Sequence, residues 1–324
     1  LKPYGVDWGF MTVMLSRQRY VGGVTTNGKV LFFWSHDGKL AMPPLDLPGG
    51  GGPAPEDEPP EFLWKDLMDP DLIPFLFNLI QGWELEVANT PAIHPETGRL
   101  YITAAGARPN TGVLYGIDIS DDALTIAFQA PMGGGSGTSP AISHDGTAVY
   151  AVDELGRMVA IDAHTGRRLW QSKEGGGGAA SPSVGPDETI YTPFQDRITA
   201  YTRRGDVRWE RSYDGLCIKR LPEPGGVWNH ILSEPVAFID SILTVGIRKG
   251  WMNVVCGYHL PKFLSRSDRT RVPIPQESLF VTFDLASGVR VGEPLVLPVT
   301  SEGFVTPVSY GNVMGTTSGA ITAI

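Results

Sequence analysis

One stretch of the sequence gathers side chains that could bind a ligand, namely Trp228, Asn229, His230 and Glu234. An amide, an imidazole and a carboxylate offer polar contacts or ligands for a cation, and an aromatic ring offers an apolar face. Residues of similar types stand in two other stretches, as Glu86, Asn89, Glu302 and Phe304. If the three stretches meet in the fold, they form a site for a polar ligand or a cation. Alternatively, these side chains satisfy one another and their own loop backbone, and the sequence leaves both interpretations open.

Other motifs that could carry chemistry are weak. His94, His144 and His164 lack the spacing of metal ligands. The glycine runs at 133–135 and 175–178 are not phosphate loops, because no Lys-Ser or Lys-Thr follows at the required spacing. They indicate either a crowded backbone or open space for a ligand. We therefore predict no metal site and assign no catalytic residue.

Charge and hydropathy restrict the classes of partner. The chain has 26 Lys and Arg against 35 Asp and Glu, which gives a net charge of −9. Nucleic-acid backbones require clustered basic side chains, so the composition argues against a nucleic-acid partner. The apolar stretch at 72–83 is too short to span a bilayer, so we predict no transmembrane span.

The elements that must position these residues follow from composition and an internal repeat. The 40 Gly and 27 Pro argue against a helical bundle and favour many short strands joined by turns. A Ser-Pro or Thr-Pro pair opens each repeat, followed by short apolar strands and Gly-containing turns. The shortest step, from Pro140 to Pro182, is 42 residues, which fits four short strands. The pairs are Thr90-Pro91, Ser139-Pro140, Ser181-Pro182, Glu234-Pro235 as a variant, and Thr306-Pro307.

The best-formed unit contains Ala-Ile-Asp-Ala-His-Thr-Gly-Arg-Arg-Leu-Trp at residues 160–170. This segment resembles the repeat of quinoprotein-like (PQQ-repeat) β-propellers, in which the Asp begins a turn, the Thr-Gly closes it and the Trp packs between blades. The resemblance covers residues 89–324 and, more weakly, residues 22–41. The Trp position falls at Ile126 in one unit and near Gly292 in another. The resemblance implies an all-β propeller of four-stranded blades, with a WD-like repeat architecture.

Counting the units predicts about six blades in a single domain that spans residues 1–324. The last unit lacks an outer strand, and the apolar residues 6–15 precede the first unit. We therefore expect this N-terminal strand to complete the last blade and close the ring. The alternative is that the sequence is a trimmed piece of a larger propeller. In such a ring, the loops that lead into the innermost strands converge at one mouth of the axial channel. The resemblance places the candidate ligand-binding residues of all three stretches at that mouth.

Three segments do not fit the repeat. Residues 43–61 are rich in Pro and Gly and predict a loop or linker. Residues 62–83 are apolar but broken by prolines, which predicts a small helical insertion that packs on the propeller or contacts a partner. Residues 248–278, with basic Lys262, Arg266, Arg269 and Arg271, predict a solvated basic loop or, alternatively, a contact with an anion or a partner. The candidate partner contacts of the helical insertion are Phe62, Leu67, Phe75 and Phe77.

The two cysteines, Cys217 and Cys256, are either one disulfide or two buried thiols, and their spacing does not decide between these states. The chain begins at Leu1, which is compatible with removal of an export signal. We expect a periplasmic or extracellular location.

Two functions are compatible with these features. The favoured one is an exported, non-catalytic binding or scaffold module for protein assembly, with a protein or a small polar ligand as partner. Non-catalytic relatives of the PQQ-repeat kind act in this way in outer-membrane protein assembly. The alternative is a quinoprotein-type oxidoreductase, or another enzyme, with a site around His230, Glu234 and Glu302. Such dehydrogenases stack PQQ on adjacent cysteines beside calcium and have eight blades, whereas this chain has no adjacent cysteines and about six units. We therefore predict no cofactor.

Overall fold

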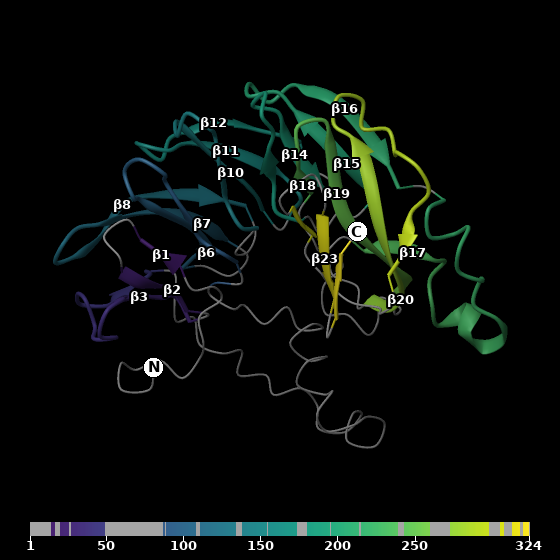
Figure 1. Ribbon diagram of the computed structural model, residues 1–324, viewed down its shortest axis with the longest axis horizontal. Helices are drawn as coiled ribbons and strands as arrows, with labels where there is room; N and C mark the ends of the chain where they lie inside the picture. The colour runs from purple at the N-terminus through teal and green to yellow at the C-terminus, as the bar shows by residue number, and fades with distance from the viewer. Residues whose placement is uncertain are drawn as a thin grey trace, which may run out of the picture.

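In the computed structural model, short strands form six antiparallel sheets that follow one another along an arc (Figure 1). The structure describes residues 14–16, 20–25, 27–48, 87, 89–107, 111–133, 138–153, 155–173, 180–194, 196–213, 215–238, 243–259, 273–297, 305–307, 313–317 and 320–323. All statements on structure below concern these residues.

Each sheet is built from strands that are consecutive in the sequence. The first contains β1 (Met14–Leu15), β2 (Tyr20–Val24), β3 (Lys29–Trp34) and β4 (Leu45–Asp46). The second contains β5 (Ala92–Ile93), β6 (Leu100–Ala105), β7 (Gly112–Ile119) and β8 (Leu124–Met132). The third contains β9 (Ala141–Ile142), β10 (Ala148–Val152), β11 (Met158–Asp162) and β12 (Arg168–Gln171). The fourth contains β13 (Ser183–Val184), β14 (Ile190–Pro193), β15 (Arg197–Tyr201) and β16 (Val207–Ser212).

The last two sheets depart from this four-stranded pattern. The fifth contains β17 (Val236–Phe238), β18 (Thr244–Val245), β19 (Lys249–His259), β20 (Pro273–Asp284) and β21 (Leu295–Val296), with β18 pairing to β19 beside the main path. The sixth has three described strands, β22 (Val305–Pro307), β23 (Val313–Thr317) and β24 (Ala320–Ala323). A single 3-10 helix, η2 (Gly226–His230), precedes β17 within the described residues.

The N-terminal strand lies in the first sheet rather than in the last. Met14 and Leu15 pair with Gly22 and Val21, and the Ser16 N–H donates to the Tyr20 carbonyl at 2.8 Å. The expectation that residues 6–15 complete the last blade is therefore wrong for Met14 and Leu15. The first unit lacks a Ser-Pro, Thr-Pro or Glu-Pro pair like those that open the later units, so β1 carries no recognisable sequence signal. Residues 6–13 lie outside the described residues, and closure of the ring stays a prediction.

An aromatic side chain on the outer strand packs on a turn glycine of the next sheet. Trp170 lies over Gly205, and Trp209 lies over Gly288. The indole N–H of Trp170 donates to the Arg203 carbonyl at 2.8 Å, and that of Trp209 donates to Leu285 at 3.1 Å. Both glycines have positive φ, and a Cβ on either would overlap the indole. Glycine is therefore required there by backbone conformation and by space.

In the second sheet this aromatic is Phe128, not Ile126. Phe128 pairs with Gly116 just before a register shift, as Trp170 pairs with Ala160 before the same kind of shift. Phe128 also packs on a turn glycine of the next sheet, Gly166. The assignment to Ile126 is wrong because β7 runs to Ile119 before it turns, which moves the equivalent position along the chain.

The residues of the Ser-Pro and Thr-Pro pairs join successive sheets. The Thr90 N–H donates to Ser139 Oγ at 2.9 Å, and the Ser139 N–H donates to Ser181 Oγ at 3.1 Å. On another set of turns, His94 and His144 form hydrogen bonds through their Nε2 atoms with the carbonyls of Gly146 and Gly185. These histidines therefore hold neighbouring turns together.

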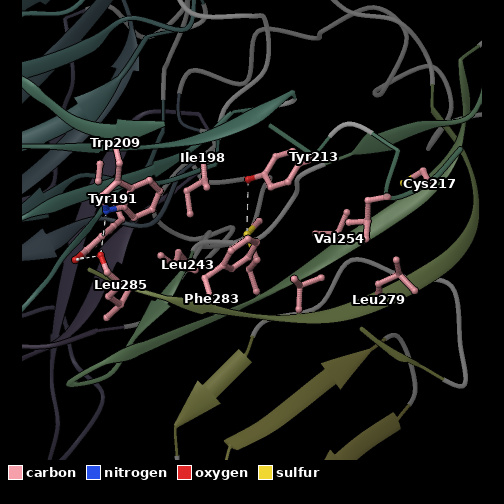
Figure 2. Packing of buried hydrophobic residues seen from close by; sticks show 14 of the residues in the cluster. Tyr191, Ile198, Trp209, Tyr213, Cys217, Leu243, Val254, Leu279, Phe283 and Leu285 are labelled. Atoms are coloured by element: carbon pink, nitrogen blue, oxygen red, sulfur yellow. Dashed lines mark hydrogen bonds between the residues drawn. The ribbon is translucent and has the colours of Figure 1, made fainter. Parts of the chain in front are cut away.

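The hydrophobic core is divided among the interfaces between neighbouring sheets. The largest cluster lies between the fourth and fifth sheets and includes Ile198, Leu243 and Phe283 (Figure 2). Tyr213 is buried there, and its hydroxyl contacts Met252 Sδ at 3.7 Å. Burial raises the pKa of Tyr213 well above its ordinary value.

Two of the segments outside the repeat contribute strands. Residues 45 and 46, within the Pro/Gly-rich stretch, form β4, and Leu47 is buried. Much of 248–278 is not a loop, because β19 and β20 pair from Lys249↔Asp284 to His259↔Pro273. The rest of the Pro/Gly-rich stretch from residue 49, the predicted helical insertion at 62–83 and the basic residues Lys262, Arg266, Arg269 and Arg271 lie outside the described residues.

Candidate binding site

The structure separates the predicted ligand-binding residues that it describes. Trp228, Asn229 and His230 are exposed on η2, which projects beyond the arc of sheets as a green coiled ribbon (Figure 1). Asn89 lies beside the second sheet, at the other side of the arc, where its amide donates to Thr103 Oγ1 at 3.0 Å. Glu234 is exposed just before β17. The remaining candidates lie outside the described residues, namely Glu86, Glu302, Phe304, Phe62, Leu67, Phe75 and Phe77.

The connection between β16 and β17, residues 215–235, is held to the fifth sheet by a disulfide. Cys217 and Cys256 are bonded, with their Cα atoms 5.2 Å apart, and both are buried. Cys256 is on β19, so the bond fixes the start of the connection to a central strand. The structure thus decides between the two states that the sequence left open. We call residues 215–235 the bridging segment.

Hydrogen bonds and an ion pair attach the later residues of the bridging segment to β19 and β20 of the fifth sheet. The Tyr258 hydroxyl donates to the Pro222 carbonyl at 2.6 Å. Arg220 forms an ion pair with Glu277 of β20, which raises the pKa of the arginine and lowers that of the glutamate. Close to β17, the Ser233 N–H donates to the His259 carbonyl, and the His259 N–H donates to Ser233 Oγ at 2.8 Å.

Between these contacts the bridging segment exposes an apolar tip. No residue of η2 is buried. Val227 is 65% exposed and Trp228 is 55% exposed, while Ile218, nearer the disulfide, is 54% exposed. A large aromatic side chain on a segment held at both ends is the kind of residue that dominates binding energy at protein interfaces.

A pocket of about 270 Å³ opens beside the disulfide, between the fourth and fifth sheets. Its wall on the fifth sheet is the run Glu234, Pro235, Val236 and Ala237, which leads into β17. The other lining residues come from the fourth sheet and the bridging segment, namely Asp196, Tyr213, Gly215, Cys217 and Ile218. The sequence points to Glu234 and Cys217 but not to Asp196, Tyr213 or Ile218, because no motif indicates that these residues lie together in the fold.

The buried residues that line the pocket are apolar or aromatic, and its exposed charged side chains are acidic. Pro235 and Tyr213 are buried, whereas Glu234 is exposed and the Asp196 side chain is 57% exposed. The Asp196 carboxylate accepts from Arg197 at 2.8 Å, and the same guanidinium donates to Glu210 at 2.9 Å. Burial tends to lower the pKa of Arg197, but Asp196 and Glu210 outweigh it and raise that pKa. One arginine thus faces two carboxylates, and Glu234 adds a third negative charge near the opening.

Within the described part of the chain, no group of three or more His, Cys, Asp or Glu is placed to hold a metal ion. Nor does any helix there have the length and apolar character to cross a membrane.

Comparisons with known proteins agree with the repeat. Residues 80–215 match the model of a family described as outer membrane protein assembly factor BamB. No curated protein matches the chain. The β-propeller domain of Cps50 (Swd1) from Myceliophteria thermophila is similar at a TM-score of 0.52 and 12% identity, over 96% of this chain and 81% of that chain. The C-terminal WD40 domain of Sif2 has a TM-score of 0.45 and 12% identity, over 74% of this chain and 57% of that chain. The family match and the fold similarity to Cps50 together confirm the resemblance to PQQ-repeat β-propellers.

Proposed function

We propose that this chain is an exported β-propeller that acts as a non-catalytic binding scaffold in protein assembly. The family matched by residues 80–215 is described as an assembly factor, which supports this class of function. The observation that carries the proposal is the exposed Trp228 on a segment held to the sheet by a disulfide, an ion pair and hydrogen bonds. A surface held in this way loses little conformational entropy when it binds a partner.

The disulfide supports a periplasmic or extracellular location. Disulfides persist in oxidising compartments, whereas thiols stay reduced in the cytosol. Cys217 and Cys256 are buried and bonded, as expected for a structural disulfide of an exported protein.

The proposal includes a ring of six blades. Its support is the aromatic–glycine contact, which repeats between the second and third, third and fourth, and fourth and fifth sheets. In a closed ring, the axial channel mouth is a second surface for a small polar ligand. Glu86, Asn89, Glu302 and Phe304 belong to that part of the proposal, and Phe62, Leu67, Phe75 and Phe77 stay candidate partner contacts.

The test places a photoreactive phenylalanine analogue at position 228 in cells that naturally export the protein. We expect a covalent adduct with one protein of the same compartment. The matched control carries the analogue at Val207, which is 56% exposed at the start of β16 and outside the bridging segment. Adducts of equal yield from both positions, or from Val207 alone, would contradict the proposal.

A variant separates binding from folding. Trp228→Ala should weaken binding of the identified partner by about thirty-fold, as for a residue that dominates an interface. Because Trp228 is exposed, the free energy of unfolding should change by less than about 0.5 kcal/mol. Equal partner affinity for the variant and the parent would remove Trp228 from the interface.

The enzymatic alternative has a separate readout. The visible absorption spectrum and the calcium content of the purified protein report on a bound quinone and its metal. A stoichiometric quinone would replace the scaffold proposal with a quinoprotein-type oxidoreductase.

A further inference from the structure

We propose that the pocket between the fourth and fifth sheets binds an extended polypeptide segment that carries a basic side chain with apolar neighbours. This inference rests on the proposed binding function and names the chemistry of the partner. Three observations carry it: the shape of the pocket, its charge and the fixed position of its walls.

The shape favours an extended chain. Residues 234–237 line the pocket as a continuous run that enters β17. β17 is the edge strand of the fifth sheet and, among the described strands, pairs only with β19. Edge strands bind extended peptides by adding a strand, with alternate side chains of the peptide entering pockets on one face.

The charge favours a basic side chain. Of the lining residues, Asp196 and Glu234 are acidic, and none is Lys, Arg or His. Two cations adjoin the lining residues: Arg197, which is shared between Asp196 and Glu210, and Lys219, which follows Ile218 and whose stem lies beside Gly215. The three carboxylates Asp196, Glu210 and Glu234 exceed these two cations by one charge. The opening therefore keeps an excess of negative charge, which attracts a cation and repels an acidic segment.

The apolar lining fits the stem of the same side chain. Cys217, Val236 and Ala237 offer apolar surface below the carboxylates, and Ile218 stands exposed at the rim. Lys and Arg bury their methylene stems along such surfaces while the charged head stays near carboxylates and water. An apolar neighbour in the peptide then packs on Ile218.

The walls of the pocket are held in place before any ligand binds. The disulfide fixes Cys217 to β19, and the Tyr213 N–H donates to the Asp196 carbonyl at 3.0 Å. On the far side, Ser233 bonds to His259 at the end of β19. Because these contacts join all three parts of the pocket, binding requires little rearrangement.

The experiment uses the purified full chain with its disulfide intact and a fluorescein-labelled hexapeptide of alternating Val and Lys, capped at both ends. Fluorescence anisotropy measures the dissociation constant. The control peptide has Glu at each Lys position. We expect binding of the Lys peptide, at least ten-fold weaker binding of the Glu peptide, and affinity for the Lys peptide that falls as salt is raised.

A matched pair of variants locates the site. Glu234→Gln should weaken binding of the Lys peptide by about five-fold, the size expected for one partly exposed ion pair. Glu223→Gln, an exposed acidic residue of the same bridging segment that does not line the pocket, should leave the dissociation constant unchanged. Equal loss in both variants would show attraction to general negative charge and would overturn the pocket as the site.

The outcomes distinguish this inference from the proposed function. If the Lys peptide fails to bind, or binds no better than the Glu peptide, the inference is wrong even if the adduct at position 228 forms. If the peptide binds as expected but position 228 gives no adduct, the pocket stands and the proposed interface at the tip fails.

Discussion

Trp209 and Gly288 show how single residues hold neighbouring sheets together. The indole is 8% exposed, donates its N–H to Leu285 and covers Gly288 in a turn of the next sheet. A Cβ on Gly288 would lie 2.4 Å from Trp209 Cε3, a distance that side chains do not tolerate. The contact therefore depends on the absence of one methyl group.

We predict that Gly288→Ala destabilises the protein by about 3 kcal/mol, the sum of a left-handed backbone and a steric clash. Gly38→Ala is the matched control, because Gly38 has the same φ of +69° but open space around its Cα. It should cost about 1 kcal/mol, which is the backbone part alone. Urea denaturation of both variants measures the difference. Equal losses would mean that Trp209 moves aside without cost.

At this scale the repeat predicted part of the structure. The turn glycines and the role of Trp170 and Trp209 follow from the resemblance to PQQ repeats. The sequence predicts the packing aromatic position at Ile126, but the structure has it at Phe128, because the pattern does not reveal that the β7–β8 hairpin is longer. The sequence does not decide whether Cys217 and Cys256 are bonded, because their proximity depends on how the bridging segment lies on β19.

The bridging segment shows that one element can be irregular in backbone and still be fixed in position. It has one short 3-10 helix and no strand, yet it is tied at Cys217, Arg220, Pro222 and Ser233. These contacts reach β19 and β20 of the fifth sheet. Its position therefore depends on the neighbouring sheet, in addition to the backbone hydrogen bonds within its own turns.

We predict that removing the disulfide with the pair Cys217→Ala and Cys256→Ala lowers the free energy of unfolding by about 4 kcal/mol. The estimate follows from the entropy of closing a loop between residues 39 apart. Guanidinium denaturation of the parent with and without reductant, beside the double variant, measures the effect. The double variant should be insensitive to reductant. A parent whose stability does not change on full reduction would contradict the prediction.

The fifth sheet was the least predictable element. The sequence predicts a loop for residues 248–278 because this segment does not follow the short, Gly-bounded strand pattern of the other units. In the structure β19 lies between β17 and β20, and nearly all of its residues are buried. A strand buried on both faces loses the alternation of polar and apolar residues that would reveal it.

Across the whole molecule, aspartates in corresponding turns accept hydrogen bonds from the residues that follow them. Asp162 Oδ1 accepts from the His164 and Thr165 N–H groups and from the Thr165 hydroxyl. Asp284 Oδ1 accepts from the N–H and hydroxyl of Ser287. These hydrogen bonds lower the pKa of Asp162, mainly through the Thr165 N–H, and the pKa of Asp284, mainly through the Ser287 hydroxyl.

A lowered pKa in the folded state means that the ionised turns stabilise the protein above the unfolded pKa of about 3.9. This contribution is lost as the pH falls through the lower folded values. We therefore predict a loss of stability below about pH 4, and a smaller loss in the pair Asp162→Asn and Asp284→Asn. Urea midpoints at pH 7, 4 and 3 measure it, with Glu223→Gln as an exposed control. A double variant with the same acid dependence as the parent would show that these turns are not responsible.

The order of the sheets was predictable at this scale because each one repeats a local pattern of short strands and glycine turns. Sequence also indicated an all-β propeller. It did not place the N-terminal strand, since Met14–Leu15 joins the first sheet without a motif of its own. Nor did it reveal the pocket, because Asp196, Tyr213 and Glu234 come together only when two sheets pack.

The bridging segment is attached to the fifth sheet on both sides of its tip, so the sequence of the tip can vary between related proteins without a change in the sheets. Residues 223–232 lie between the Pro222 and Ser233 contacts, and their helix buries nothing. Changes of length or composition there leave the aromatic–glycine contacts between sheets untouched. Loops from other proteins should therefore be graftable at this position, and homologues that keep the same sheets can differ in what they recognise.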